Sequence, residues 1–397
     1  MPLSSTASCK WRWREQSGDL MFTLEESARI GESEPRWAAA ARKESADSFL
    51  ARALPSEREE SWRYTMIDNF NINKFTSSRA SVKSQSRFVM AMEDALKQKK
   101  ELLDTFMKEK NPGLDKFDYL NSAFWTSGYF VHIPENTDAS LIEITLQSGI
   151  SRNFIIMEAN SSAEILEHIT GGSGLNSNFT EVHAPKDAKV TVHSLHDAAD
   201  DVSEFSYKRA YIGRNSSVNW NVGQFGGSLN RIKVDNFFVG EGAHSRTVGV
   251  FSGAGKQHMD LSTNAFHSVP NTSSNIIVKG ALKGSASEVY RGVIKIEKTA
   301  PGTSSYLSDH AIMLGENAVA NSIPSLMIDN SEVQCSHSAS AGQVDEEKMI
   351  YMMSRGLSRE QAETMIVEGF YVPVINAIPS IAVREKMTDM IRKRMLS

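Results

Sequence analysis

The segment that begins near Tyr119 contains no window of helical periodicity for roughly two hundred residues. Short runs of Val, Ile, Phe and Thr alternate there with Gly, Asn, Ser and Asp, which is typical of short strands separated by turns. A chain of 397 residues is too long for one ordinary core, and this segment makes up more than half of it. The sequence therefore predicts a mainly β protein.

One local unit recurs within this segment: a turn, a small residue, then a short alternating strand. The small residues are Ala188, Ser217, Ala243, Ala286 and Ala318, at steps of 29, 26, 43 and 32 positions. Such a repeat predicts a parallel β-helix over residues 119–344 with Val190 and Trp220 inside, because each coil buries its apolar face only against its neighbours. The long middle step indicates a skipped or bulged unit. A Greek-key sandwich uses similar strands and turns, and spacing alone leaves both architectures open.

Helical sequence precedes the β segment. Residues 1–22 are expected to form a disordered leader, and residues 23–118 an N-terminal helical domain. This domain is predicted to contain one long helix from Ser84 to Lys110, because apolar residues recur there at helical spacing. They are Phe88, Met92, Leu96, Leu102, Leu103 and Phe106.

Helical sequence also follows the β segment, and it predicts a C-terminal helical domain over residues 345–397. Asp345 is expected to cap its first helix, Gly356 to end that helix, and Ser358 with Gln361 to form a capping box for the next. A final helix is predicted from about Ile381 to Met395. Seven of the seventeen methionines lie in this domain, and their flexible side chains suit either an irregular core or an adaptable binding surface.

Composition excludes several classes of protein. Forty-three Lys and Arg residues against 48 Asp and Glu give a net charge of −5, which argues against a nucleic-acid partner. No run approaches the roughly 18 apolar residues of a spanning helix, so no membrane insertion is expected. The two cysteines, Cys9 and Cys335, are too few for a disulfide framework or a multi-thiolate metal motif. A reducing, cytoplasmic setting is therefore expected.

Two short motifs bear on chemistry. The segment 253–257, Gly-Ala-Gly-Lys-Gln, lacks both the first glycine and the hydroxyl residue of a P-loop, so no ATPase activity is expected. Cys335 and His337 are two positions apart and would share one face of a strand, where they could hold a soft metal together. A buried cysteine beside a hydrogen-bonded histidine is the alternative, and two ligands are too few for a stable site.

The residues around Cys335 carry a resemblance to the SufB/SufD family of iron–sulfur cluster assembly proteins. The chain resembles the C-terminal signature of that family at residues 335–339, 342–347, 353–358 and 367–370, and matches it upstream at 267–272, 279–280, 290–292, 323–324 and 120–124. The resemblance implies a right-handed parallel β-helix between helical ends. It also implies a SufC-type ABC ATPase and a SufB paralogue, or a second copy of the chain, as partners.

Within the family, the chain is similar to SufD. Residues 34–37 (Glu-Pro-Arg-Trp) and 62–65 (Trp-Arg-Tyr-Thr) resemble the SufD N-terminal domain. The chain has Leu-Ser-Asp-His at 307–310 where SufB has a catalytic cysteine, and Ser338 where SufB has a glutamate. The resemblance implies a non-catalytic scaffold subunit with His337 and Cys335 at the cluster-assembly interface. It implies no cofactor held tightly by the chain alone, and a transient iron–sulfur cluster in the assembled complex.

The C-terminal domain is the expected docking site for the ATPase. The residues expected to contact it are Met349, Met352, Met353, Arg355, Gly356, Met365, Gly369 and Phe370. The final helix carries a net charge of +3 over residues 384–394 and is expected to aid the encounter.

A stand-alone carbohydrate-active or adhesive β-helix is the alternative function. Such a protein is expected to show clustered acids or aromatic stripes across successive coils. The acidic run 197–201 instead has the character of a solvated turn.

Overall fold

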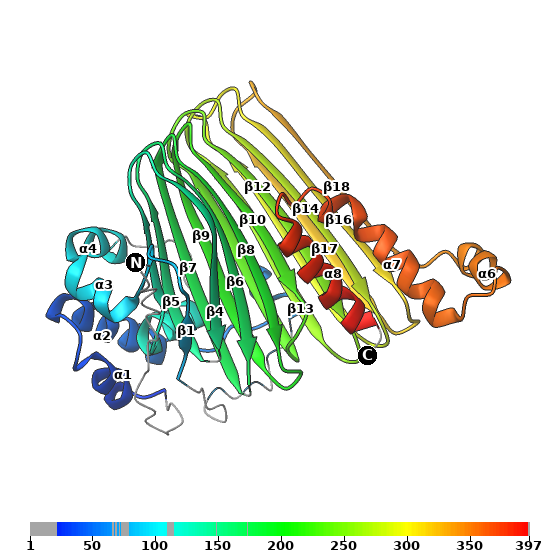
Figure 1. The fold of residues 1–397 in the computed structure, drawn as a ribbon, viewed down its shortest axis with the longest axis horizontal. Coiled ribbons are helices and arrows are strands. Elements are labelled where there is room, and N and C mark those ends of the chain that lie inside the picture. Colours follow the sequence, from blue (N-terminus) through cyan, green and yellow to red (C-terminus); the bar gives the residue numbers. More distant parts are fainter. Residues whose placement is uncertain are drawn as a thin grey trace, which may run out of the picture.

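A computed structural model describes residues 22–65, 67, 70, 72, 79–108, 115–147, 149–172 and 174–395, without the side chains of 105, 106 and 108. The predicted leader lies outside these residues except for Phe22, which is buried and packs edge-on against Phe49 and Phe124. Two nine-stranded sheets face each other and form an elongated body with helices at both ends (Figure 1). Successive strands of the chain alternate between the two sheets from β3 onward.

The first sheet consists, in spatial order, of β1 (Ser81–Lys83), β4 (Asp138–Gln147), β6 (Ser162–Gly171), β8 (Lys189–Ala198), β10 (Ser217–Gln224), β12 (His244–Gly253), β14 (Ser273–Leu282), β16 (Ser304–Met313) and β18 (Gln334–Gln343). The second sheet consists of β2 (Val89–Ala91), β3 (Tyr129–Ile133), β5 (Ile150–Met157), β7 (Leu175–Lys186), β9 (Ser203–Arg214), β11 (Leu229–Phe238), β13 (His258–His267), β15 (Ser287–Ile296) and β17 (Val319–Ile328). Strands β1 and β2 pair antiparallel with their neighbours, and the other pairs within each sheet are parallel.

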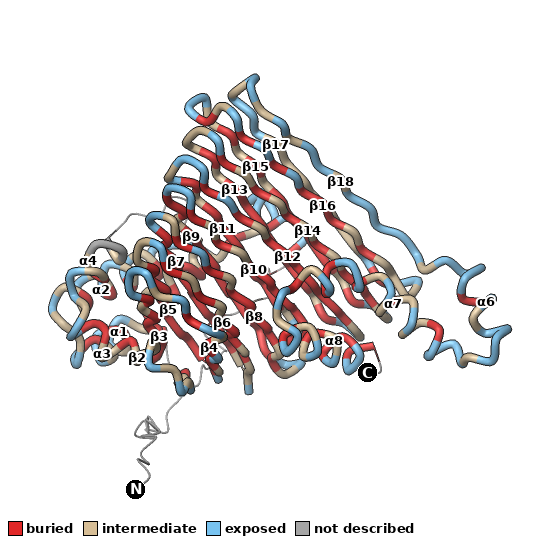
Figure 2. Tube along the Cα trace, turned by 45° about the horizontal axis from the view of Figure 1, so that its top comes forward, coloured by how far each residue is buried: buried red, intermediate tan, exposed pale blue. Residues whose placement is uncertain are grey.

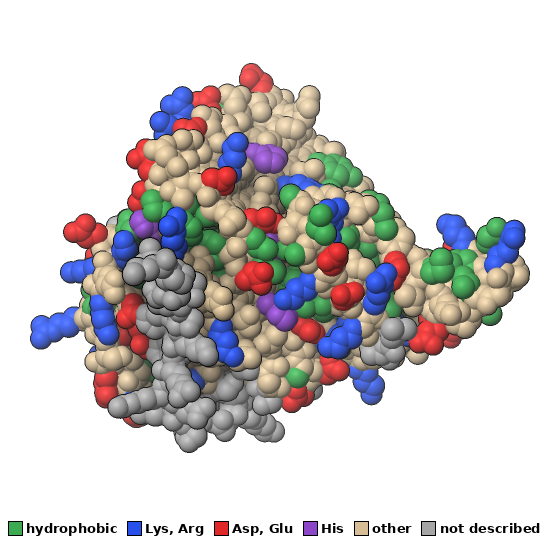
Figure 3. All heavy atoms as spheres, viewed as in Figure 1, with side chains coloured by type: hydrophobic (Ala, Val, Ile, Leu, Met, Phe, Trp, Pro, Cys, Tyr) green, Lys and Arg blue, Asp and Glu red, His purple; other side chains and the backbone are tan. Residues whose placement is uncertain are grey.

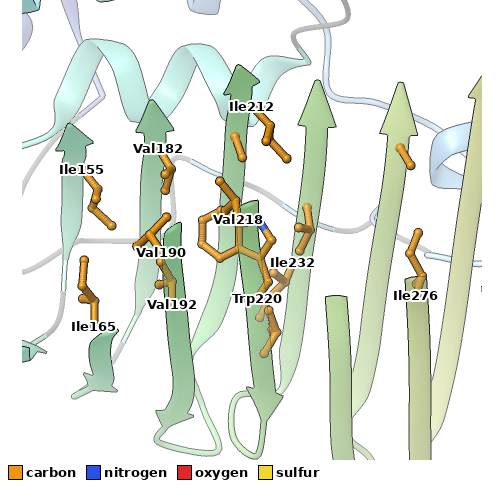
Figure 4. Close-up of a cluster of buried hydrophobic side chains, with 14 of the residues drawn as sticks. Ile155, Ile165, Val182, Val190, Val192, Ile212, Val218, Trp220, Ile232 and Ile276 are labelled. Carbon is orange, nitrogen blue, oxygen red and sulfur yellow. The ribbon is translucent and has the colours of Figure 1, made fainter. Parts of the chain in front are cut away.

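The parallel pairing confirms the β-helix and excludes the antiparallel sandwich, but the predicted start at residue 119 was too early, because α5 (Lys116–Phe124) precedes β3. The equivalent positions Lys189, Ser217, His244, Ser273, Ser304 and Gln334 pair in register, so each of these coils takes 27 to 31 residues. Side chains from both sheets meet inside, and Figure 4 shows Val190, Val192 and Trp220 of the first sheet in one cluster with Val182 and Ile232 of the second. The predicted interior positions are therefore confirmed.

The small residues of the repeat mark the start of strands, but in two different sheets. Ala188, Ser216 and Ala243 occupy equivalent places before strands of the first sheet, so Ser217 was one position late. Ala286 and Ala318 occupy the corresponding place in the second sheet. The step of 43 positions is therefore about one and a half coils, and it skips the unit of β14, which begins at Ser273 in register with His244.

One corner of the β-helix is built from residues with left-handed backbone conformation. Asn160, Asp187, Asn215 and Asn271 have φ between 51° and 57°, and Gly242 takes the equivalent place with φ 74°. Asparagine and aspartate tolerate this conformation better than other side chains do, because their short polar groups bond locally. The corner side chains also bond from coil to coil, as Asn160 does to Asn136 at 2.7 Å.

The N-terminal helices cover the outer face of the second sheet at its first coils. They are α1 (Leu24–Gly31), α2 (Arg36–Ala51), the 3₁₀ helix η1 (Glu60–Trp62), α3 (Met92–Gln98), α4 (Lys100–Lys108) and α5 (Lys116–Phe124). Phe117 of α5 stacks on Phe205 of β9 with ring centroids 3.7 Å apart. This apolar cluster anchors the helices to the β-helix.

The prediction of one helix from Ser84 to Lys110 was wrong. Residues 89–91 form β2, which pairs with β3, and the helical part is divided at Lys99 into α3 and α4. Met92, Leu96 and Leu103 are buried as a helical pattern requires, so the periodicity was real but the single helix was not. Residues 109 and 110 lie outside the described part of the chain.

The C-terminal helices are α6 (Glu346–Ser354), α7 (Arg359–Ile375) and α8 (Ile381–Met395), and both ends of α6, the start of α7 and both ends of α8 agree with the prediction. Asp345 caps α6, Gly356 follows it with φ 94°, and Ser358 and Gln361 form the capping box of α7. α7 and α8 pack on the outer face of the first sheet, where they bury Leu195 and Val248 among others. α6 projects away from the β-helix (Figure 1).

Basic residues of α8 hold this helix against the β-helix. Arg394 lies 2.6 Å from Asp200 and 3.6 Å from Asp197, and Lys393 lies 3.9 Å from Asp197. Asp200 and Asp201 lie in an exposed turn, as predicted, while Asp197 at the end of β8 and Asp200 also form ion pairs with α8. Much of the positive charge expected to aid an encounter is engaged within the chain.

Candidate functional site at the last coil

The last coil of the β-helix, formed by β17 and β18, leaves the edges of both sheets without a further strand among the described residues. We call this edge the open end. Most of β18 is exposed, whereas the preceding strands of both sheets are largely buried (Figure 2). Val319, Met327 and Ile328 of β17 are exposed apolar residues. The open end therefore presents unpaired backbone groups beside apolar side chains.

Cys335 and His337 lie on β18 at the open end. The register pairs Cys335 with Ser305 and His337 with Leu307, and Leu307 belongs to the apolar interior. Cys335 also packs against this interior and is half-buried, while His337 is exposed. The two residues therefore share the inward face of β18, as their spacing predicts, and His337 is not a buried structural histidine.

Cys335 ends a column of buried serines that crosses four coils of the first sheet. Ser245, Ser274, Ser305 and Cys335 pair in register from strand to strand. Ser274 and Ser305 are hydrogen-bonded, and the imidazole Nε2 of His267 lies 3.0 Å from the Ser274 hydroxyl. Burial raises the pKa of the Cys335 thiol, so the free chain holds it protonated at neutral pH. Iron ligation would require this proton to leave.

The described part of the chain contains no group of three or more His, Cys, Asp or Glu side chains arranged to hold a metal ion. Cys335 and His337 can supply one sulfur and one nitrogen ligand, both suited to iron. A tetrahedral site at this position would need ligands beyond those that the described residues place there. The exposed position of His337 leaves it free to reach one.

Two buried acids near the open end were missed by reasoning from sequence. Glu288 of β15 and Asp309 of β16 are each 1% exposed. Burial raises the pKa of Asp309 to about 7, although the Ser322 hydroxyl opposes this shift. Burial also raises the pKa of Glu288 well above its usual value, and the negative charges of Asp309 and Asp260 add to the shift. Strand alternation could have found Asp309, because it lies two positions from the inward Leu307.

The residues expected to contact an ATPase lie on α6, on α7 and in the turn between them, and their environments differ. Met353 and Met365 are exposed, as are Arg355, Gly356 and Gly369, and Met352 is half-buried. Met349 is buried, and the carbonyl of Phe370 accepts a 2.8 Å hydrogen bond from Lys279 of β14. Ile350 and Tyr351, which sequence reasoning passed over, are each 60% exposed. Figure 3 shows hydrophobic and cationic side chains together on the projecting α6.

The outer face of the second sheet carries an aromatic stripe across successive coils, which sequence reasoning did not find. His183, Tyr211, Phe237 and Phe266 stack in turn with centroids 4.8 to 5.3 Å apart. Interplanar angles of 15° to 17° turn the ring faces toward each other. Sugars bind aromatic faces, and these faces are already covered, so the stripe favours a structural ladder over a carbohydrate site.

The segment 253–257 forms the end of β12 and the turn into β13. A P-loop requires a helix directly after its lysine, where aligned amides can bind phosphate. A strand follows here instead, which agrees with the rejection of this motif.

The fold and the open end define a class of protein: a parallel β-helix with helical ends, whose last coil offers a thiol and an imidazole at an unpaired sheet edge. Residues 141–370 match the family model for the SufBD core domain of the SUF system for FeS cluster assembly, and the chain belongs to this SufBD family. Iron–sulfur cluster assembly SufBD family proteins of Staphylococcus haemolyticus, Staphylococcus aureus and Staphylococcus epidermidis are each 31% identical to it over 300 residues.

The matched region covers 72% of this chain and 64% of each of these relatives, so the chain matches less than two thirds of their length. Across the described residues, none of the helices is long and apolar enough to cross a membrane.

Proposed function

We propose that the chain is a SufD-like scaffold subunit for iron–sulfur cluster assembly in the cytoplasm. It would pair with a SufB paralogue or with a second copy of itself, and a separate SufC-type ABC ATPase would hydrolyse ATP. The chain itself would be non-catalytic, and the nascent cluster would be its cargo rather than a resident cofactor. The observation that carries this proposal is the position of Cys335 and His337 on an unpaired edge strand in a member of the SufBD family.

The open end favours a partner that adds to the sheet edges. Unpaired edge strands readily pair with another chain, and exposed apolar residues such as Met327 gain from being covered. A partner docked there would lie against His337 and could supply ligands that the described residues do not place at this site. Pairing would also remove the Cys335 thiol from water together with the iron that it binds.

The projecting α6 favours the ATPase as its partner. Ile350, Tyr351 and Met353 expose apolar surface on a helix that contacts the rest of the chain mainly through α7. Exposed apolar and aromatic side chains on a small projecting element are typical of protein interfaces. The open end and α6 are separate surfaces, so both partners could bind at once.

The test of the proposed function is His337→Ala in the reconstituted complex. Because His337 is exposed, the variant should keep the unfolding free energy of the wild type within about 0.5 kcal/mol. Iron and sulfide per complex should fall several-fold, since a nitrogen ligand or proton acceptor is lost.

The matched control is His310→Ala. His310 lies on the adjacent strand and its imidazole Nδ1 is 2.7 Å from the Ser340 hydroxyl, a contact on the outer side of the sheet. Normal cluster loading with His337→Ala, or an equal loss with His310→Ala, would contradict the proposal.

A further inference from the structure

Three oxygen atoms inside the last two coils have no hydrogen-bond partner in the described structure. They are Glu288 Oε1 on β15, Asp309 Oδ1 on β16 and Ser322 Oγ on β17. Each belongs to a side chain on the inward face of its strand, and each is closed off from solvent. Buried polar atoms in native proteins are almost always satisfied, so three such atoms in one region call for an occupant.

The electrostatic interactions show that these groups lie near one another. The Asp309 carboxylate acts on Glu288, and the Ser322 hydroxyl acts on the Asp309 carboxylate and lowers its pKa. The nearby Tyr290 hydroxyl is already bonded to Thr263 at 2.7 Å and does not satisfy either acid. Two carboxylates in one buried region cannot both ionise unless a cation compensates them.

The last coil leaves a way in to this region. On the next strand toward the open end, the register pairs Ala320 with Glu288 and Ala339 with Asp309. Alanine is small, and both residues lie at the open end, where β18 is exposed. One coil with small side chains therefore separates the two acids from the face that carries Cys335 and His337.

We propose that Glu288, Asp309 and Ser322 form a binding site for a divalent cation inside the last two coils. Carboxylate and hydroxyl oxygens are ligands for hard and borderline divalent metals, and water would complete a coordination shell to which Glu288 and Asp309 give two acidic ligands. The identification of this cation as ferrous iron rests on the proposed function, in which the site would hold iron next to the residues that assemble the cluster. Cation binding would release the carboxyl protons that burial retains.

The test uses the full-length metal-free chain with Mn²⁺ as the probe, because bound and aqueous Mn²⁺ differ in electron paramagnetic resonance. We expect one bound Mn²⁺ per chain, displaced by Fe²⁺ under anaerobic conditions. The double variant Glu288→Gln and Asp309→Asn keeps the size of both side chains and should weaken binding at least tenfold. A wild-type chain that binds no Mn²⁺ at millimolar concentration would overturn the proposal.

Control variants show whether Mn²⁺ binds at this site or at other acids. They also distinguish a failure of this proposal from a failure of the proposed function. Asp329→Asn with Glu332→Gln removes two exposed acids between β17 and β18 and should leave the affinity unchanged; an equal loss would overturn the proposal. If the double variant fails to fold, Ser322→Ala should weaken binding several-fold, and an unchanged affinity would count against the site. Cys335→Ser with His337→Ala should still bind Mn²⁺. Retained Mn²⁺ binding in a wild-type complex that never loads a cluster would refute the proposed function alone.

Discussion

At the scale of single residues, Cys335 differs from the other members of its column only in its sulfur. Ser245, Ser274 and Ser305 show that a hydroxyl fits this inward position in three preceding coils. Cys335→Ser should therefore leave the unfolding free energy almost unchanged. Cluster loading of the complex should fall, though less than with His337→Ala, because a hydroxyl is a much poorer iron ligand than a thiolate.

The pH dependence of loading gives this prediction a second readout. Because burial raises the pKa of the Cys335 thiol, loading of the wild-type complex should become faster as pH rises from 7 to 9. The Cys335→Ser complex should lose this part of the pH dependence. The prediction is checked by following cluster absorbance at several pH values, and identical pH profiles for the two complexes would contradict a role for the thiol.

The raised pKa of Asp309 leads to a prediction about the pH dependence of stability, which is separate from cluster assembly. Its pKa is about 7 in the folded chain and near 3.8 in the unfolded chain, so the folded state binds a proton more tightly. The stability gained from this proton is complete below pH 4 and is lost as pH rises through 7. Asp309→Asn does not titrate. Its advantage in unfolding free energy over the wild type should grow from pH 4 to pH 7, by at most about 1.4 kcal/mol per pH unit, and then stay constant.

Denaturant unfolding of both chains in a chelating buffer measures this difference. The comparison cancels groups that both chains share, including buried His267, whose pKa of about 4 gives the opposite slope over part of the range. A difference that is the same at pH 5 and pH 8 would show that Asp309 is not the titrating group.

At the scale of elements, the sequence specifies structure best where the signal is local. Asp345, Gly356, Ser358 and Gln361 act on backbone groups within a few positions of themselves, and the helix boundaries that they predict are correct. The segment 84–110 failed because the pairing of Val89–Ala91 with β3 is a contact between distant residues. Its apolar residues are buried in either arrangement, so periodicity could not separate one helix from a strand and two helices.

The candidate site shows the same division. The spacing of Cys335 and His337 predicts their shared face, since strand alternation is a local property. The exposure of that face is not local, because it depends on β18 being the last strand of its sheet. The grouping of Glu288 with Asp309 and Ser322 depends on how three strands of different sheets are stacked. The sequence contains these residues but does not indicate which of them meet.

The projecting helix α6 gives a prediction at the element scale. Ile350→Asp with Tyr351→Ser should weaken ATPase binding at least tenfold, because both side chains are 60% exposed and available to an apolar interface. The melting temperature should not change. Point substitutions test this surface better than removal of residues 345–395 does, since removal would also uncover Leu195 and Val248.

Binding of the purified ATPase can be measured by calorimetry for the wild-type chain, the α6 variant and a control. Leu50→Asp is a suitable control, because Leu50 is 46% exposed on α2 at the other end of the molecule. ATPase affinity within twofold of the wild type for the α6 variant would exclude α6 as the docking element.

At the scale of the whole molecule, the two ends of the β-helix differ in how far other elements cover them. Helices and the antiparallel strands β1 and β2 are added around the first coils, whereas the described part of the chain places no element over the edges of β17 and β18. Natural proteins usually protect sheet edges with charge, bulges or covering segments, because bare edges promote association. The exposed apolar residues at this edge therefore indicate a surface that binds another protein chain.

The open end leads to a prediction about assembly. Val319→Asp with Met327→Asp places two charges on β17, and pairing would have to remove both from water without compensation. The variant should remain folded but sediment as a single chain, whether the wild type pairs with itself or with a SufB paralogue. Val239→Asp is the control, because Val239 is 53% exposed, close to the 52% of Met327, and lies away from the open end after β11.

Cluster loading of the same variant tests whether pairing at the open end is needed to bind the cluster. Cys335 and His337 are intact in Val319→Asp with Met327→Asp, so a site completed within one chain would still load. A site that needs ligands from a partner would lose its cluster together with the pairing, and this is the result that we expect. Normal loading of a chain that sediments alone would show that the open end is not where the cluster is completed, even if it is where the partners meet.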